Sequence, residues 1–200
     1  MPGYDTPAPA QEAAPVKILI AGGFGVGKTT LVETVSEIEP LRTEERLTSA
    51  GVGVDDLDGI ESKTATTVAM DFGRITLTDA QVVLYLFGTP GQERFWFMWD
   101  DLLNGALGAI VLVDTRRLDR SFPAVDFFEN RGLPFVVAAN CFHGEQPYTD
   151  EEIRAALHLR DPNTPIRMLD ARSRDDARGA LLSLLDMLIT NAGVAATATG

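Results

Sequence analysis

The chain has 200 residues, which is enough for one α/β domain with a substantial buried core. Its net charge of −12 argues against a nucleic-acid backbone or an anionic membrane surface as the main partner. The one cysteine, Cys141, has no partner for an internal disulfide, and the sequence has neither a secretory signal nor a run of about 20 apolar residues. We therefore expect a cytoplasmic protein that reaches a membrane only through a partner.

Apolar runs that alternate with helical patterns predict the elements in chain order. Residues 1–15 hold four prolines among alanines and polar residues and predict a disordered tail, and 192–200 predict a flexible C-terminal tail. The predicted strands are 16–21, 67–77, 82–87, 108–114, 134–140 and 165–169. The predicted helices are 28–38, 95–105, 121–131, 149–158 and 173–191.

Continuous apolar strands separated by helices predict a mostly parallel sheet with helices on both faces. The short link 78–81 permits only a hairpin, so the strands on either side of it are predicted to be antiparallel. The expected fold is a single α/β domain over residues 16–191, with six strands that include one antiparallel edge pair. The stretch 40–66 has little periodicity and is predicted to be a long functional loop.

The first predicted strand leads into a glycine-rich loop. Apolar residues 18–21 are followed by Gly22-x-x-x-x-Gly27-Lys28-Thr29, after which apolar residues recur at helical spacing. In this context the loop N–H groups and the helix N-terminus face a bound phosphate, Lys28 reaches the β- and γ-phosphates, and the Thr29 hydroxyl binds Mg²⁺. The sequence therefore predicts a P-loop domain that binds a nucleoside triphosphate or diphosphate. The predicted phosphate-binding residues are Gly22, Gly23, Phe24, Gly25, Val26, Gly27, Lys28, Thr29, Thr30 and Gly91.

Two later segments carry a resemblance to a known family. Leu86-Phe87-Gly88-Thr89-Pro90-Gly91-Gln92-Glu93-Arg94-Phe95 resembles switch II of Ras-like small GTPases, and the loop that ends in Thr67-Val68-Ala69-Met70-Asp71-Phe72 resembles switch I. The Thr-Pro-Gly-Gln variant resembles the MglA family, and residues 16–190 resemble the small GTPases of actinobacterial conservon operons. Those GTPases accompany a roadblock/LC7 protein and a histidine-kinase-like sensor, so the resemblance implies signalling through such partners.

The resemblance also implies a slow, Mg²⁺-dependent GTP hydrolysis that switches two loops. Gln92 would orient the attacking water, the Gly91 N–H would sense the γ-phosphate, and Thr67 would bind Mg²⁺. Thr64 and Thr66 stay open as alternatives to Thr67. Loss of the γ-phosphate would release both loops, which partners read. The implied catalytic residues are Gln92, Thr67 and Lys28, and the implied metal ligands are Thr29 and Thr67.

The sequence departs from the small-GTPase pattern in two places. Gly88 stands where the family has an aspartate that holds the Mg²⁺ shell through water, and Asp71 is a candidate substitute. The guanine-reading Asn-Lys-x-Asp element appears as Asn140-Cys141-Phe142-His143, and 170–172 resembles the Ser-Ala-Lys loop that meets guanine O6. Guanine and adenine therefore both stay open as the base. The predicted base-binding residues are Asn140, Cys141, His143, Ala171 and Arg172.

Other functions stay open beside the GTP switch. Gly88 and the altered base motif also fit a nucleotide-bound interaction protein that does not hydrolyse. A P-loop ATPase would use Asp114 as a late acid at a strand end. Arg94 either swings toward the phosphates or lies on the surface. The aromatic run 95–99 cannot face inward entirely from one helix, so we expect at least one of its side chains to be exposed for a partner.

Overall fold

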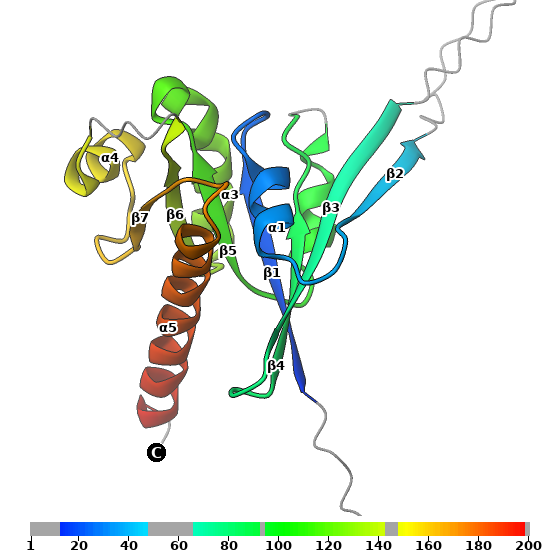
Figure 1. Ribbon diagram of the computed structural model, residues 1–200. Coiled ribbons are helices and arrows are strands. Elements are labelled where there is room, and N and C mark those ends of the chain that lie inside the picture. The colour runs from blue at the N-terminus through cyan, green and yellow to red at the C-terminus, as the bar shows by residue number, and fades with distance from the viewer. Residues whose placement is uncertain (1–12, 48–65, 93–94, 143–147, 199–200) are drawn as a thin grey trace, which may run out of the picture.

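The computed structural model describes residues 13–47, 66–92, 95–142 and 148–198 (Figure 1). Strands and helices alternate along most of the chain, as the apolar pattern predicts. In chain order the elements are β1 (Ala14–Gly22), α1 (Lys28–Val35), β2 (Leu41–Leu47), β3 (Thr66–Leu77), β4 (Val82–Gly88), α2 (Met98–Leu103), β5 (Ala106–Val113), the 3-10 segment η2 (Thr115–Ser121), α3 (Phe122–Arg131), β6 (Phe135–Asn140), α4 (Asp150–Leu157), β7 (Ile166–Leu169) and α5 (Arg174–Ala198).

One seven-stranded sheet forms the centre of the molecule, in the order β2-β3-β4-β1-β5-β6-β7. β1 lies in parallel between β4 and β5, and β6 and β7 continue the parallel part. β3 runs antiparallel to β4, so the predicted hairpin is confirmed. The fold is therefore a single α/β domain with a mostly parallel sheet, as expected.

Helices cover both faces of this sheet, and each face has its own apolar core. On one face, α1 and α5 bury side chains such as Leu31 and Leu184 against Ile18 and Ile110. On the other face, Phe128 of α3 and Trp99 of α2 pack against the alternate residues of the central strands. Because β1 and β5 are covered on both sides, their sequences are apolar almost throughout.

The structure corrects three sequence predictions. A seventh strand, β2, lies within the predicted loop 40–66 and pairs antiparallel with β3. An edge strand is held by backbone hydrogen bonds on one side only and needs no apolar pattern, which is why the polar sequence of β2 gave no signal. At the ends, β1 begins inside the predicted tail 1–15, and α5 continues to Ala198 through the predicted tail 192–200. Alanines in that last stretch favour helix.

Two helices are also shorter than predicted by three or more residues, and the first is α1, which ends at Val35 where the prediction gave 28–38. The predicted helix 95–105 shortens to α2, because residue 95 is in a 3-10 conformation and residues 96–97 form a turn before Met98. Figure 1 shows the C-terminal part of α5 extending downward past the neighbouring strands β6 and β7. Within the described part of the chain, no helix is both long and apolar enough to cross a membrane.

Candidate functional site

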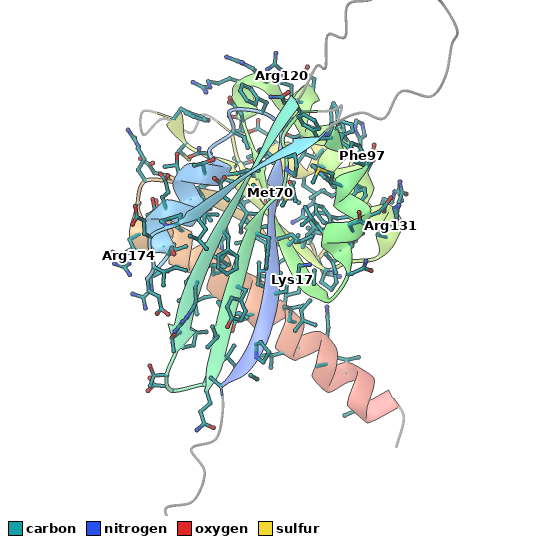
Figure 2. All side chains as sticks on the ribbon, turned by 90° about the vertical axis from the view of Figure 1, so that its right-hand side faces the viewer. Lys17, Met70, Phe97, Arg120, Arg131 and Arg174 are labelled. Carbon is teal, nitrogen blue, oxygen red and sulfur yellow. The ribbon has the colours of Figure 1, made fainter. Side chains whose placement is uncertain are left out.

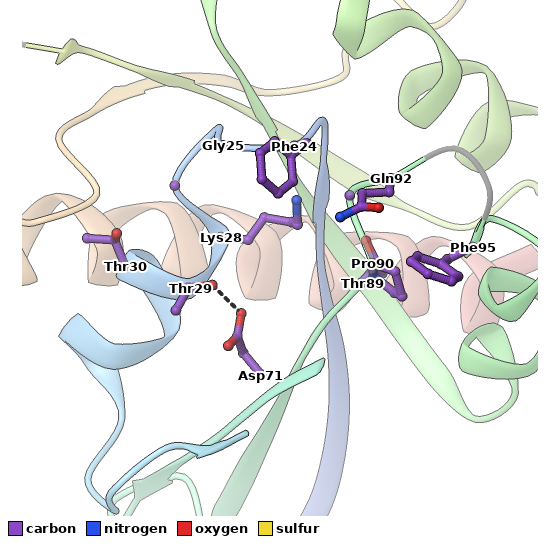
Figure 3. A pocket seen from close by; sticks show the side chains of 12 residues that line it. Phe24, Gly25, Lys28, Thr29, Thr30, Asp71, Thr89, Pro90, Gln92 and Phe95 are labelled. Carbon is purple, nitrogen blue, oxygen red and sulfur yellow. Dashed lines mark hydrogen bonds between the residues drawn. The ribbon is translucent and has the colours of Figure 1, made fainter. Parts of the chain in front are cut away.

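A cavity of about 380 Å³ opens where the glycine loop meets β3 and the segment after β4 (Figure 3). Three parts of the chain that are far apart in sequence meet here, because β1 lies beside β4 and β4 beside β3. In parallel α/β sheets, ligands bind at such carboxyl ends of strands. The cavity is lined by Phe24, Gly25, Gly27, Lys28, Thr29, Thr30, Asp71, Thr89, Pro90, Gly91, Gln92 and Phe95.

Two glycines fix the shape of the loop between β1 and α1. Gly22 has φ +135°, and a Cβ there would lie 2.3 Å from the carbonyl oxygen of Leu112. Gly27, with φ +109°, caps α1, and its carbonyl accepts the hydrogen bond from the Leu31 N–H that opens the helix. Because positive φ disfavours side chains, the loop is restricted to glycine at both positions. The N-terminus of α1, whose first N–H groups have no acceptor within the helix, lines the cavity.

Lys28 crosses the cavity from the first residue of α1. Its Nζ donates to the carbonyl oxygens of Gly22 (2.9 Å) and Gly23 (2.8 Å), and the residue is only 9% exposed. Burial lowers the pKa of Lys28 to about 8, while the Asp71 carboxylate acts in the opposite direction. A Cβ on Gly91 would lie 2.5 Å from this Nζ, so the segment after β4 presses directly against the lysine.

Thr29 and Asp71 form a pair of oxygen donors at the floor of the cavity. The Thr29 hydroxyl donates to Asp71 Oδ2 at 2.6 Å, and Asp71 is 9% exposed (Figure 3). Gly88 makes room for this carboxylate, because a Cβ at position 88 would lie 3.1 Å from Asp71 Oδ2. The aspartate that the small-GTPase resemblance predicts at position 88 is thus absent from β4, and the Asp71 carboxylate of the neighbouring strand β3 lies beside that position.

The other residues predicted for hydrolysis are placed only in part. Gln92 and Gly91 line the cavity, with Gln92 exposed to solvent. The backbone of Thr67 lies in β3 opposite Arg46, and its side chain falls outside the described residues. Thr64 and Arg94 also lie outside the described residues, so the choice among the switch I threonines stays a prediction.

The predicted base-binding residues meet behind the loop. Asn140 Nδ2 donates to the Val26 carbonyl (2.9 Å), and its Oδ1 accepts from the Ala171 N–H (3.1 Å). Buried Asn140 therefore ties the glycine loop to the segment after β7. Arg172 is exposed and pairs through two bonds with Asp170, which lowers the pKa of that carboxyl to about 2.

Two base-motif residues contribute less to this arrangement. Cys141 is half-buried, and its backbone N–H donates to the Leu169 carbonyl. Burial raises the pKa of its thiol. His143 lies outside the described residues. Asp114, considered above as an ATPase acid, lies outside the phosphate cavity and pairs with Arg116 instead. The carboxylate in the cavity is Asp71.

Replacing Asn140 by alanine is expected to destabilise the protein by about 2–4 kcal/mol, because the buried Val26 carbonyl and Ala171 N–H would both lose their partner. Chemical denaturation of the variant measures this loss. The exposed Asn130 offers a control, since its side chain only accepts a bond from Arg160 at the surface. An Asn140→Ala variant as stable as Asn130→Ala would show that the tie between loop and β7 contributes little.

Sequence reasoning missed three cavity residues. Thr89 is 2% exposed, and its hydroxyl has no hydrogen-bond partner among the described residues. The Pro90 carbonyl accepts a hydrogen bond from the indole N–H of Trp99 (3.0 Å), and Phe95 lines the cavity as well. The aromatic run behaves as expected, since Phe95 and Trp99 are buried while Phe97 is exposed. The motif could have indicated Thr89 and Pro90, because both lie in the segment that resembles switch II, directly before the predicted site residue Gly91.

Comparison with curated proteins gives relatives of two kinds. An uncharacterized protein of Methanocaldococcus jannaschii is 30% identical over 127 residues, which are 62% of this chain and 69% of that protein. The Ras-related protein Rab-32C of Dictyostelium discoideum is 26% identical over 70% of this chain and 58% of its own length. The human Ras-related protein Rab-7b is 29% identical over 75% of this chain and 63% of its own length. The chain thus matches less than two thirds of either Rab protein.

The chain is also similar to solved structures and to one protein family. The cytosolic domain of the FeoB iron transporter of T. maritima in apo form matches 87% of this chain and 64% of its own, with a TM-score of 0.61 and 15% identity. Its GDP form I gives a TM-score of 0.60. At this identity the likeness shows the GTPase-like fold alone. Residues 20–191 match a P-loop family over most of the chain, so this protein belongs to the family described as conserved hypothetical ATP binding protein.

Proposed function

We propose that this protein is a GTP-binding molecular switch that hydrolyses GTP slowly with Mg²⁺ in the cytoplasm. The observation that carries the proposal is the cavity itself, in which Lys28, Thr29 and Gln92 face one space at the N-terminus of α1. A phosphate tail in that space would accept from Lys28 in place of the carbonyls of Gly22 and Gly23. The bound anion would also raise the depressed pKa of Lys28 and hold it charged.

Thr29 and Asp71 fit a magnesium ion by their chemistry. Mg²⁺ prefers oxygen donors and commonly uses one or two protein ligands beside phosphate oxygens and water. Within the described residues no group of three or more His, Cys, Asp or Glu forms a dedicated metal site, which agrees with a metal that arrives with the nucleotide. When bound, the ion would neutralise charge on the phosphates. Thr67 is the further ligand that the family resemblance implies.

Gln92 would hold the attacking water, since it is exposed at the rim of the cavity next to Gly91. The described lining contains one cationic side chain, Lys28, and no arginine. Phosphoryl transfer depends on charge stabilisation, and a missing arginine typically lowers the rate by several orders of magnitude. Slow turnover is therefore the expected behaviour of the isolated protein. The partners that the resemblance suggests are a roadblock/LC7-type regulator and a histidine-kinase-like sensor.

A second candidate, an adenine-nucleotide P-loop protein, is favoured by two findings. The Ala171 N–H and the Arg172 N–H, which the resemblance places near guanine O6, both donate to internal acceptors. A guanine contact there needs one of these bonds to be exchanged. The family description also speaks of ATP. Guanine is nevertheless proposed because Asn140 holds the loop and base segments together at the end of β6.

Base selectivity tests the proposal directly. We expect the purified protein to retain GDP, and GTP to displace it far better than ATP in the presence of Mg²⁺. The Gln92→Leu variant should bind both nucleotides as the unchanged protein does but lose most of its hydrolysis, because only the water-positioning group is removed. Retained adenine nucleotide, or equal competition by ATP, would give the adenine alternative first place. Unchanged hydrolysis in Gln92→Leu would remove Gln92 from the mechanism.

A further inference from the structure

A second cavity, of about 200 Å³, adjoins the glycine loop where η2 packs against it. The contact between loop and η2 is close, because a Cβ on Gly23 would lie 3.1 Å from the carbonyl oxygen of Arg120. Phe24 and Gly25 line this cavity as well as the phosphate cavity, so the two spaces share a wall. The lining residues are Gly23, Phe24, Gly25, Val26, Asp114, Arg116, Arg117, Arg120 and Ser121.

Three arginines line this cavity, and one of them, Arg116, forms an ion pair with Asp114. Arg116 makes two hydrogen bonds of 2.9 Å to Asp114, and its guanidinium lies 3.8 Å from the centre of the Phe142 ring. In the part of the chain that the structure describes, Arg117 and Arg120 form neither a salt bridge nor a side-chain hydrogen bond. Two guanidinium groups therefore lack a bonded partner among the described residues, although Arg117 also acts on the Asp114 carboxylate through its charge and helps to lower the pKa of that group. The chain that carries them has a net charge of −12.

An exposed aromatic side chain, Phe24, lies beside these arginines. Phe24 is 68% exposed although it belongs to a glycine loop, and its ring stands at the rim of both cavities. Aromatic residues and arginines are enriched where proteins bind each other, and the planar guanidinium matches the two oxygens of a carboxylate. A positive cavity on an acidic protein also selects a negatively charged partner.

We propose that this cavity docks an acidic segment of a partner protein. A carboxylate of the segment binds between Arg117 and Arg120, and a neighbouring apolar side chain of the segment packs on Phe24. The shared wall couples docking to the phosphate cavity, since a ligand that moves Phe24 or Gly25 changes both spaces. This coupling rests on nucleotide binding, whereas the docking itself does not depend on hydrolysis.

Calorimetric titration with the synthetic peptide acetyl-Leu-Glu-Glu-Leu-Glu-Glu-Leu-amide tests the docking. We expect the unchanged protein to bind it, and the Arg117→Glu/Arg120→Glu variant to bind at least about tenfold more weakly, because charge pairs become repulsive. The control Arg174→Glu/Arg178→Glu makes the same charge change on two exposed arginines of α5. Figure 2 shows Arg120 and Arg174 on separate parts of the surface. The control should bind within about twofold of the unchanged protein, since screening limits distant charges.

Three results would overturn the proposal. No measurable heat with the unchanged protein would mean that the cavity does not take acidic segments. Equal weakening in both double variants would reduce the effect to net charge. Displacement of the peptide from the Lys28→Ala variant by an equal concentration of inorganic pyrophosphate would mean that the cavity takes free phosphate groups, because the phosphate cavity of that variant is weakened. Peptide binding is read without nucleotide, so a failure of the proposed GTP binding would leave this test intact.

Discussion

Replacing Lys28 by alanine is expected to weaken GTP and GDP binding at least about 100-fold, a loss of about 3 kcal/mol. The lysine is the one cationic side chain in the described lining of the phosphate cavity. It is also buried and positioned by two carbonyls, so that little ordering remains when it meets a phosphate. Calorimetric titration with each nucleotide measures the loss.

Stability separates this effect from unfolding. Burial disfavours the charged form of Lys28, as its lowered pKa shows, so that removing the ammonium should leave the thermal midpoint unchanged or raised. The control is Lys17→Ala, because Lys17 contacts the Asn104 carbonyl and the Phe87 ring away from the phosphate cavity. A Lys28→Ala variant that binds nucleotide as tightly as Lys17→Ala would refute the phosphate-binding role of the loop.

Removing the Asp71 carboxylate is expected to abolish most of the Mg²⁺-dependent part of GTP affinity, by about tenfold to 100-fold, the range seen when outer metal partners are lost. The reason is its 2.6 Å bond to the Thr29 hydroxyl, which holds that oxygen in place. The measurement is GTP affinity of Asp71→Ala with and without Mg²⁺. Affinity measured without the metal should change little.

The matched rescue variant moves the acid to the neighbouring strand. A side chain at position 88 starts 3.1 Å from Asp71 Oδ2, so Asp71→Ala/Gly88→Asp returns a carboxylate to nearly the same place. We expect it to recover most of the Mg²⁺ dependence. Gly88→Asp alone should lose it, because two carboxylates then compete for one space and repel each other. If Asp71→Ala retains full Mg²⁺ dependence, the metal is held elsewhere.

The sequence predicted the parts of the fold that apolar burial controls. The central strands are covered on both faces, and their continuous apolar runs marked them clearly. The sequence did not predict β2, because the pairing of this strand with β3 uses backbone groups, which any sequence provides. The sequence also did not predict the end of α5. The small residues there form no apolar stripe, so only their helix propensity indicates a helix.

The candidate site divides in the same way. The glycine loop is local in sequence, so its motif alone placed Lys28 and Thr29 together with the helix that carries them. The meeting of Asp71 with Gly88 depends on which residues of β3 and β4 face each other. Such a register is set by the tertiary structure, and the sequence could only name Asp71 as one candidate.

The hydrogen bond from Trp99 to the Pro90 carbonyl has an optical consequence. Trp96 and Trp99 are the only tryptophans of the chain, and their ring centres lie 5.8 Å apart just beyond the phosphate cavity. Any ligand that shifts Pro90 or its neighbours changes the surroundings of the Trp99 indole, and the one other tryptophan, Trp96, lies directly beside it. We therefore expect the native tryptophan emission to change when a ligand occupies the cavity, so that binding can be followed without a label.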